Sequence, residues 1–128
     1  MLSLVLEDWL TDVGDGIVRK LAAGNGKLSS AERLVYELWL LDTEARNGGL
    51  SQYFANHDLQ QWQSCIAVCA GASLQSFVPF AEAVSDIIAG AADSYDAINA
   101  SERAGDDLWY AHKAQVVGEL HAICKNAL

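Results

Sequence analysis

The sequence lacks features that several classes of protein need. Only eight Lys and Arg residues stand against 17 Asp and Glu residues, so the formal net charge is −9. Proteins that bind nucleic acids or anionic lipids place basic patches where the contacts form, so we expect no direct binding of this chain to nucleic acid or membrane. Strand signals are nearly absent as well, because apolar and polar residues do not alternate over any sustained stretch.

Signatures of catalysis are also missing. No Ser or Cys lies in a Gly-x-Ser-x-Gly turn or another recognisable nucleophile motif, and no Gly-rich loop follows a strand. Paired carboxylates are common in a chain with 17 acids, so they indicate no particular active site. We therefore expect a protein that is not an enzyme and that needs no cofactor.

The cysteines are few, and their spacing allows two interpretations. Cys65 and Cys69 stand four residues apart, and His121 and Cys124 three apart, which are spacings that a Cys₃His zinc site could use. However, Cys65 and Cys69 lie on the same helical stripe as Trp62, where reduced cysteines of a hydrophobic core usually lie. We expect no bound metal.

Export and membrane signals are absent from the sequence. The apolar start of the chain contains Glu7 and Asp8, and no Lys or Arg precedes them, as a signal peptide would require. The longest uncharged run, from Leu59 to Ala81, contains several Gln and Ser residues and Pro79, and acids flank it on both sides. We expect a cytoplasmic protein with reduced thiols.

Apolar residues make up 52% of the 128 positions, which is enough for the chain to form its own hydrophobic core. Their helical spacing predicts an all-α fold, a single compact domain over residues 1–128 with about six to seven helices. The predicted helices cover Leu4 to Ala23, Ala31 to Arg46, Leu50 to Asn56, Leu59 to Ala70, Phe77 to Ala92, Tyr95 to Ala104 and Asp107 to Asn126.

The helix predicted from Ala31 to Arg46 should lie at the centre of the fold. Ser29 and Glu32 have the spacing of a capping box at its start. Apolar residues cover most of its circumference, so neighbouring helices should surround it. Only a narrow polar strip remains, formed by Arg33, Glu37 and Glu44.

A break follows this helix. Asn47, Gly48 and Gly49 suit the left-handed backbone conformation that ends a helix, and the next helix can begin at once. Glu44 lies one turn before the break. We expect its carboxylate to accept hydrogen bonds from the free N–H groups at the start of the next helix.

Two aromatic and two amide side chains follow the break. We expect Tyr53 and Phe54 to clamp the corner between the helices, and Gln52 and Asn56 to satisfy its backbone groups. This makes the corner a structural element. The alternative is a small-ligand pocket formed by Glu44, Asn47, Gln52 and Asn56.

The order Glu44-x-x-Asn47-Gly48-Gly49-x-x-Gln52-Tyr53-Phe54-x-Asn56 resembles the signature of the bacterial DNA-mimic protein family. The likeness extends over roughly residues 30 to 125 and includes the Gly-Ala helix end at Ala70-Gly71-Ala72, whereas Leu50 stands where the family usually has Phe. The resemblance implies an all-helical domain, often a homodimer, whose acidic surface imitates the phosphates of DNA. Such a surface occupies the binding face of a basic, DNA-binding protein.

Acidic residues gather in the second half of the chain. In a helix from Phe77 to Ala92, Glu82, Asp86 and Asp93 fall within about 40° of one another, opposite the apolar stripe. Successive turns place acids about 6 Å apart, near twice the roughly 3.4 Å rise per phosphate along one DNA strand. The predicted partner-binding acids are Glu82, Asp86, Asp93, Asp96, Glu102, Asp106 and Asp107.

Three functions remain open at this point. The first is a non-enzymatic interaction protein that sequesters a basic, DNA-binding partner. The second is an immunity or antitoxin protein that plugs the cationic active site of a toxin. The third is a domain that binds a small molecule or a metal near the Asn-Gly-Gly corner. For the acidic face, the alternative is an ordinary solvated surface that is kept acidic for solubility.

Overall fold

The computed structural model describes residues 4–24, 26–102 and 108–128, and for Glu102 only the backbone. These residues form seven α-helices and no strand, which confirms the predicted all-α fold. The helices are α1 (Leu4–Ala22), α2 (Ser30–Gly48), α3 (Leu50–Asn56), α4 (Leu59–Gly71), α5 (Phe77–Ile88), α6 (Ser94–Glu102) and α7 (Leu108–Cys124). In the part of the chain that the structure describes, no helix is long and apolar enough to cross a membrane.

Two predicted bounds, Ala104 and Asp107, lie outside the described residues. The others agree with these helices to within two residues, except at the end of α5. This helix was expected to continue to Ala92, but it ends at Ile88. Gly90 adopts a φ of 72°, in the left-handed region that glycine favours, and the chain turns there. The Asp93 carboxylate then accepts a hydrogen bond from the backbone N–H of Asp96 at 3.0 Å, so Asp93 caps α6 instead of extending α5.

The start of α2 has the predicted capping box. The backbone N–H of Glu32 donates to the Ser29 hydroxyl at 3.1 Å, and the backbone N–H of Ser29 donates to the Glu32 carboxylate at 2.9 Å. Lys20 Nζ, from the end of α1, lies 3.0 Å from the same carboxylate. The cap therefore also ties α1 to α2.

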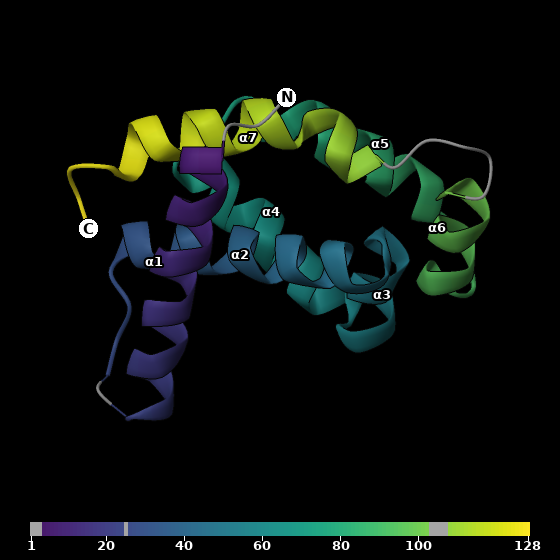
Figure 1. The fold of residues 1–128 in the computed structure, drawn as a ribbon. Coiled ribbons are helices and arrows are strands. Elements are labelled where there is room, and N and C mark those ends of the chain that lie inside the picture. The colour runs from purple at the N-terminus through teal and green to yellow at the C-terminus, as the bar shows by residue number, and fades with distance from the viewer. Residues whose placement is uncertain (1–3, 25, 103–107) are drawn as a thin grey trace.

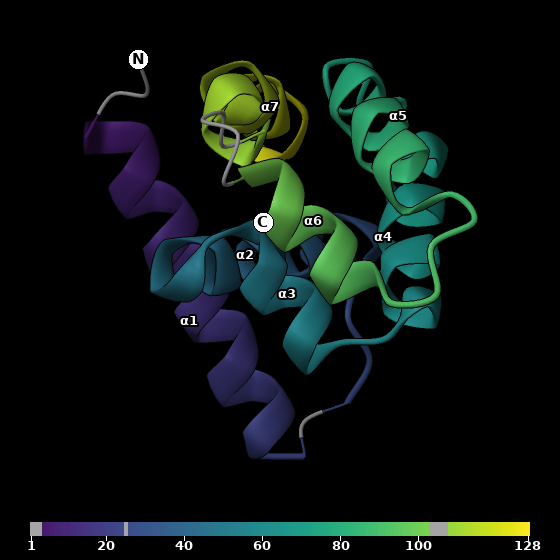
Figure 2. The same cartoon turned by 90° about the vertical axis from the view of Figure 1, so that its right-hand side faces the viewer.

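Helix α2 lies at the centre of the fold, as predicted. It packs against α1, α3, α4 and α7, and Figure 1 shows it crossing the middle of the molecule beneath α7. Its side chains Leu34, Val35, Leu38 and Leu41 are at most 1% exposed. Figure 2 shows α4 and α5 side by side at the edge of the bundle and α6 beside α3.

Helix α1 crosses α2 closely at Gly14, which is buried. A Cβ atom at this position would lie only 2.0 Å from Cδ1 of Trp39. Gly14 therefore permits the Trp39 ring to lie against the backbone of α1. This contact explains why a long helix contains a glycine in its interior.

Candidate functional site

Gly49 forms the corner between α2 and α3. Its φ of 82° lies in the left-handed region, and its N–H donates to the carbonyl oxygen of Ala45 at 2.8 Å, which closes the last turn of α2. Its own carbonyl oxygen accepts from the N–H of Gln52 at 3.0 Å, so α3 begins at once. Gly48 lies against the side chain of Gln52, because a Cβ at Gly48 would be 2.6 Å from Gln52 Oε1. Asn47 is exposed at the end of α2.

Glu44 connects α2 to the far end of α3. Its Oε2 accepts a hydrogen bond from Asn56 Nδ2 at 2.5 Å and lies 3.6 Å from Nε2 of His57. The amide of Asn56, expected to satisfy backbone groups, therefore binds a carboxylate. That Glu44 also caps the start of α3 stays a prediction.

Aromatic rings fill the inside of the corner. Tyr53 is fully buried and Phe54 is 7% exposed, and their ring centroids lie 5.2 Å apart in an edge-to-face arrangement. Trp62 of α4 contacts both rings, at 5.7 Å from Phe54 and 6.3 Å from Tyr53. Burial raises the pKa of Tyr53 far above its ordinary value, so this hydroxyl stays protonated. These ring contacts join α3 to α4, so the clamp between α2 and α3 stays a prediction.

The polar strip predicted on α2 is not all at the surface. Glu37 is fully buried, because α4 covers it. Its carboxylate accepts from Gln61 Nε2 at 2.7 Å and Ser64 Oγ at 3.4 Å and pairs with Arg33 Nη2 at 2.9 Å. These partners satisfy a charge that would otherwise be costly to bury.

Asp42 is a second buried acid of α2. Sequence reasoning missed it, although helical spacing places it about 180° from Arg33, among the apolar residues. Its carboxylate accepts from Trp109 Nε1 at 2.9 Å and Lys113 Nζ at 2.8 Å, and pairs with Arg46 Nε at 3.1 Å. Lys113 also donates to Glu7 of α1. This cluster joins α1, α2 and α7. Burial alone would lower the pKa of Lys113, but its hydrogen bonds to Asp42 and Glu7 outweigh burial and raise that pKa.

The predicted partner-binding acids of α5 are available for binding. Glu82 and Asp86 are exposed and one turn apart. Neither side chain forms an ion pair or a hydrogen bond with another residue that the structure describes. No Lys, Arg or His occurs between Asp58 and Glu102 in the sequence. The negative charge of this segment is therefore not neutralised from within it.

The remaining predicted acids are placed differently from the expectation. Asp93 and Asp96 are exposed, but they belong to the start of α6, so the single helical row through Glu82, Asp86 and Asp93 was wrong. The acids follow two helices joined by a turn. The side chain of Glu102 and all of Asp106 and Asp107 lie outside the described residues.

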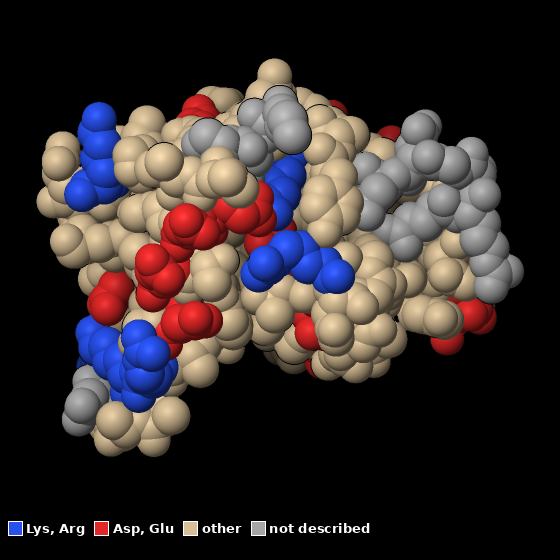
Figure 3. Space-filling model, in the orientation of Figure 1, with Lys and Arg blue, Asp and Glu red and all other residues tan. Residues whose placement is uncertain are grey.

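Helix α1 carries a second acidic row, which sequence reasoning missed. Asp8, Asp12 and Asp15 are exposed at the spacing i, i+4, i+7, which places them on one helix face. Figure 3 shows acidic side chains gathered over α1 and basic side chains at the far end of this helix. The spacing alone would have revealed this row.

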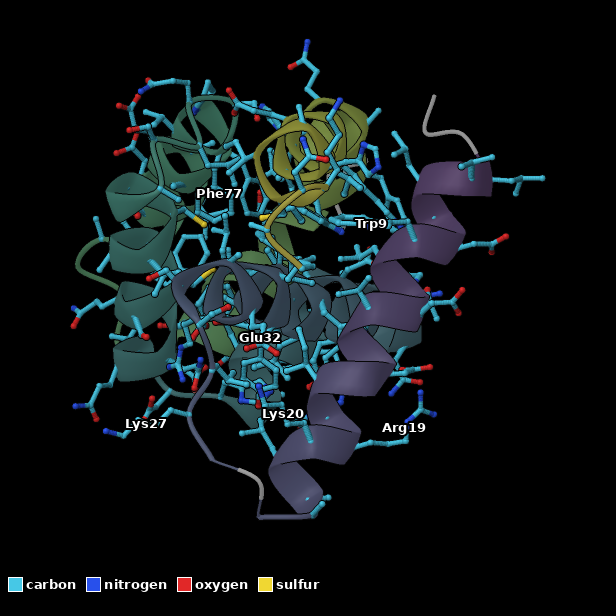
Figure 4. All side chains as sticks on the ribbon, turned by 90° about the vertical axis from the view of Figure 1, so that its left-hand side faces the viewer. Trp9, Arg19, Lys20, Lys27, Glu32 and Phe77 are labelled. Carbon is cyan, nitrogen blue, oxygen red and sulfur yellow. The ribbon has the colours of Figure 1, made fainter. Side chains whose placement is uncertain are left out.

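The basic end of α1 sets it apart from α5. Arg19 and Lys20 lie in the last turn of α1. In Figure 4, Lys20 and Glu32 point toward each other, and Arg19 and Lys27 point outward. The α1 surface thus carries both signs of charge, whereas α4, α5 and α6 contain no base.

The three cysteines are free and buried. A hydrogen bond with Cys69 and burial raise the pKa of Cys65 well above its ordinary value, and burial raises that of Cys124. Within residues 4–24, 26–102 and 108–128, no three His, Cys, Asp or Glu side chains are grouped so that they could hold a metal ion. The cysteines act there as core side chains.

Comparison with known proteins identifies one family. A family model described as DMP19-like protein matches residues 26–120, which is most of the chain and includes the corner and the acids of α5 and α6. No curated protein and no solved structure matches the chain.

Proposed function

The chain belongs to the DMP19-like protein family, and we propose that it is a non-enzymatic DNA mimic. In this proposal, carboxylates of α5 and α6 occupy the DNA-binding face of a basic protein in the cytoplasm. The residues that carry the contact are Glu82, Asp86, Asp93 and Asp96.

The observation that carries this proposal is the unpaired state of Glu82 and Asp86. A carboxylate already paired with a base inside the chain presents little field to a partner, whereas an exposed, unpaired one attracts cations over about a Debye length, roughly 10 Å at 0.1 M salt. Both acids lie on a segment without a single base. Membership of a family of DNA mimics supports the same function.

Charge reversal tests the proposal. Basic proteins are first captured from a nuclease-treated bacterial lysate on the immobilised full chain and eluted with salt. They are then bound to fluorescent duplex DNA, and the full chain is added while anisotropy is recorded. We expect the DNA to be released, with an apparent affinity that falls steeply as salt rises.

The matched variants separate the site from the net charge. The double variant Glu82→Lys/Asp86→Lys should fail to release DNA. The control Asp8→Lys/Asp12→Lys makes the same charge change at two exposed acids of α1 with the same spacing, and it should release DNA as the parent does. Asp93 is left unchanged, because reversing it would also remove the cap of α6.

Two results would contradict the proposal. If both double variants release DNA as well as the parent, the acids of α5 are not the contact. If the lysate gives a single toxin whose activity the chain blocks, the inhibitor function replaces DNA mimicry.

A further inference from the structure

A groove lies beside the unpaired acids of α5. It runs between α4 and α5 and has a volume of about 340 Å³. The buried side chains Cys69, Leu74 and Phe77 are among those that line it, together with the exposed residues Ala70 and Val78. Its lining is thus largely apolar, and its size is near the lower end of the roughly 300–1,000 Å³ typical of small-ligand sites. One or two apolar side chains of a partner would fill it.

Glu82 and Asp86 also line this groove. They are spaced i, i+4 on α5, about 6 Å apart along the helix axis, and neither has an ion-pair partner among the residues described. Two free carboxylates beside an apolar depression repel an anion, and a neutral surface would leave them without an ion-pair partner. They complement a ligand that combines an apolar group with cations about one helical turn apart.

We propose that the groove binds an amphipathic helical segment of the basic partner. An apolar side chain of that segment fills the groove, and Lys or Arg side chains one turn apart pair with Glu82 and Asp86. The inference rests on the proposed function and adds to it. Imitation of phosphates needs only charge, whereas this groove adds an apolar contact that salt does not screen.

The groove is tested directly with a designed probe and the full chain. The probe is a short, capped, Ala-rich helical peptide with two Arg residues four positions apart and one Leu between them on the same face. One control peptide replaces Leu by Ser, and another replaces both Arg by Gln. Binding to the ¹⁵N-labelled full chain is followed by chemical-shift changes at 0.05 and 0.3 M salt.

We expect saturable shifts at the amides of Ala70, Val78, Ala81 and Glu82. The peptide without Leu should bind about tenfold more weakly, as burial of one leucine side chain implies. That difference should persist at the higher salt concentration, while the contribution of the two Arg residues shrinks. Shifts that spread over the acids of α1 without saturating would overturn the proposal.

Two variants of α4 provide a matched pair. Ala70 is exposed and lines the groove, so Ala70→Leu should fill it and weaken the peptide about tenfold or more. Ala67 is exposed on the same helix and does not line the groove, so Ala67→Leu should bind the peptide as the parent does. Both changes place a good helix former on a helix surface, so the fold is retained.

The DNA-release assay separates failure of the groove from failure of the function. If Ala70→Leu and Ala67→Leu release DNA equally well at every salt concentration, the groove proposal is wrong and DNA mimicry stands. If the parent releases no DNA, the function fails, and the peptide titration alone decides whether the groove is a binding site. If Ala70→Leu turns a dimer into a monomer in sedimentation, a second copy covers the groove and the proposed occupant is wrong.

Discussion

Replacing Gly14 by alanine should destabilise the protein, although alanine is the better helix former. A Cβ at this position would lie 2.0 Å from Cδ1 and 2.6 Å from Nε1 of Trp39, whereas non-bonded carbon atoms prefer about 3.5–4.0 Å. Either the Trp39 ring or the whole of α1 must therefore move by about 1.5 Å. Trp39 is also stacked on Tyr36, with ring centroids 6.3 Å apart, so a shift of its ring disturbs a second contact.

The size of the effect follows from two opposing contributions. Overpacking of this kind costs about 1–3 kcal/mol, and replacing a glycine inside a helix by alanine gains roughly 0.5–1 kcal/mol. The free energy of unfolding of Gly14→Ala should therefore fall by about 1 kcal/mol, within a range of about 0–2.5 kcal/mol. Gly16→Ala is the control, since a Cβ at Gly16 would meet nothing within 4 Å. Only the gain of roughly 0.5–1 kcal/mol applies there.

Urea unfolding followed by far-UV circular dichroism measures both variants against the parent. In thermal unfolding, the two variants should differ by several degrees, since each kcal/mol shifts the Tm by about 3–6 °C at this chain length. Near-UV circular dichroism should change for Gly14→Ala and not for Gly16→Ala, because Trp39 moves only in the first. If Gly14→Ala is as stable as Gly16→Ala, the Trp39 ring does not lie against the backbone of α1 at Gly14, and the close crossing of α1 and α2 is contradicted.

Three further predictions concern buried or partly buried side chains. Lys113→Met should lower the free energy of unfolding by about 3 kcal/mol, because it leaves Asp42 with one fewer cation. Folding raises the pKa of Lys113. The contribution of Lys113 to the stability of the fold is therefore complete below the unfolded pKa of about 10.4 and is lost as pH rises through the folded pKa. The free energies of unfolding of parent and variant, measured with urea, should thus converge at alkaline pH. Glu44→Ala should cost about 1–2 kcal/mol by loss of its contact with Asn56 and leave DNA release unchanged once folded; a stable variant that had lost only DNA release would show that the corner is the binding site. The purified chain should contain no stoichiometric zinc and keep its circular dichroism spectrum in chelator, and one zinc per chain by elemental analysis would contradict this.

Local patterns were sufficient to predict the helices. The capping box of Ser29 and Glu32 and the break at Gly49 depend on residues within one or two turns, and both are present as expected. The end of α5 could not be read in the same way. Apolar residues continue at helical spacing beyond Ile88, and only the left-handed conformation of Gly90 and the cap formed by Asp93 end the helix.

The two buried acids of α2 differ in how far the pattern of that helix predicts them. At 100° per residue, Asp42 lies about 180° from Arg33, between Leu38 and Val35 on the apolar face, so the wheel itself indicates its burial. Glu37 lies about 40° from Arg33 on the polar strip, and the wheel contains no information about which helix covers that strip. Their partners come from elsewhere in the chain, Gln61 in α4 and Trp109 and Lys113 in α7. Such contacts depend on how the helices pack, which sequence spacing within one helix does not determine.

Under the proposed function, pairing, and not the number of acids, decides which surface of this chain imitates DNA. Many of its carboxylates already have partners within the chain, because they form ion pairs, cap helices or bind amides. The net charge of −9 does not distinguish these paired carboxylates from the unpaired ones. Among the side chains that the structure describes, the acids that form neither a hydrogen bond nor an ion pair with another described residue are Asp8, Asp12, Asp15, Glu82, Asp86 and Asp96. They form two groups. The group on α1 shares its helix with Arg19, which opposes its field, whereas Lys20 of the same turn is already paired with Glu32. The helices α5 and α6 contain no base, and Glu82 and Asp86 of α5 border an apolar groove. A basic partner that needs both charge and an apolar contact should therefore distinguish the two groups, and the paired charge reversals on α1 and α5 measure that distinction at equal net charge.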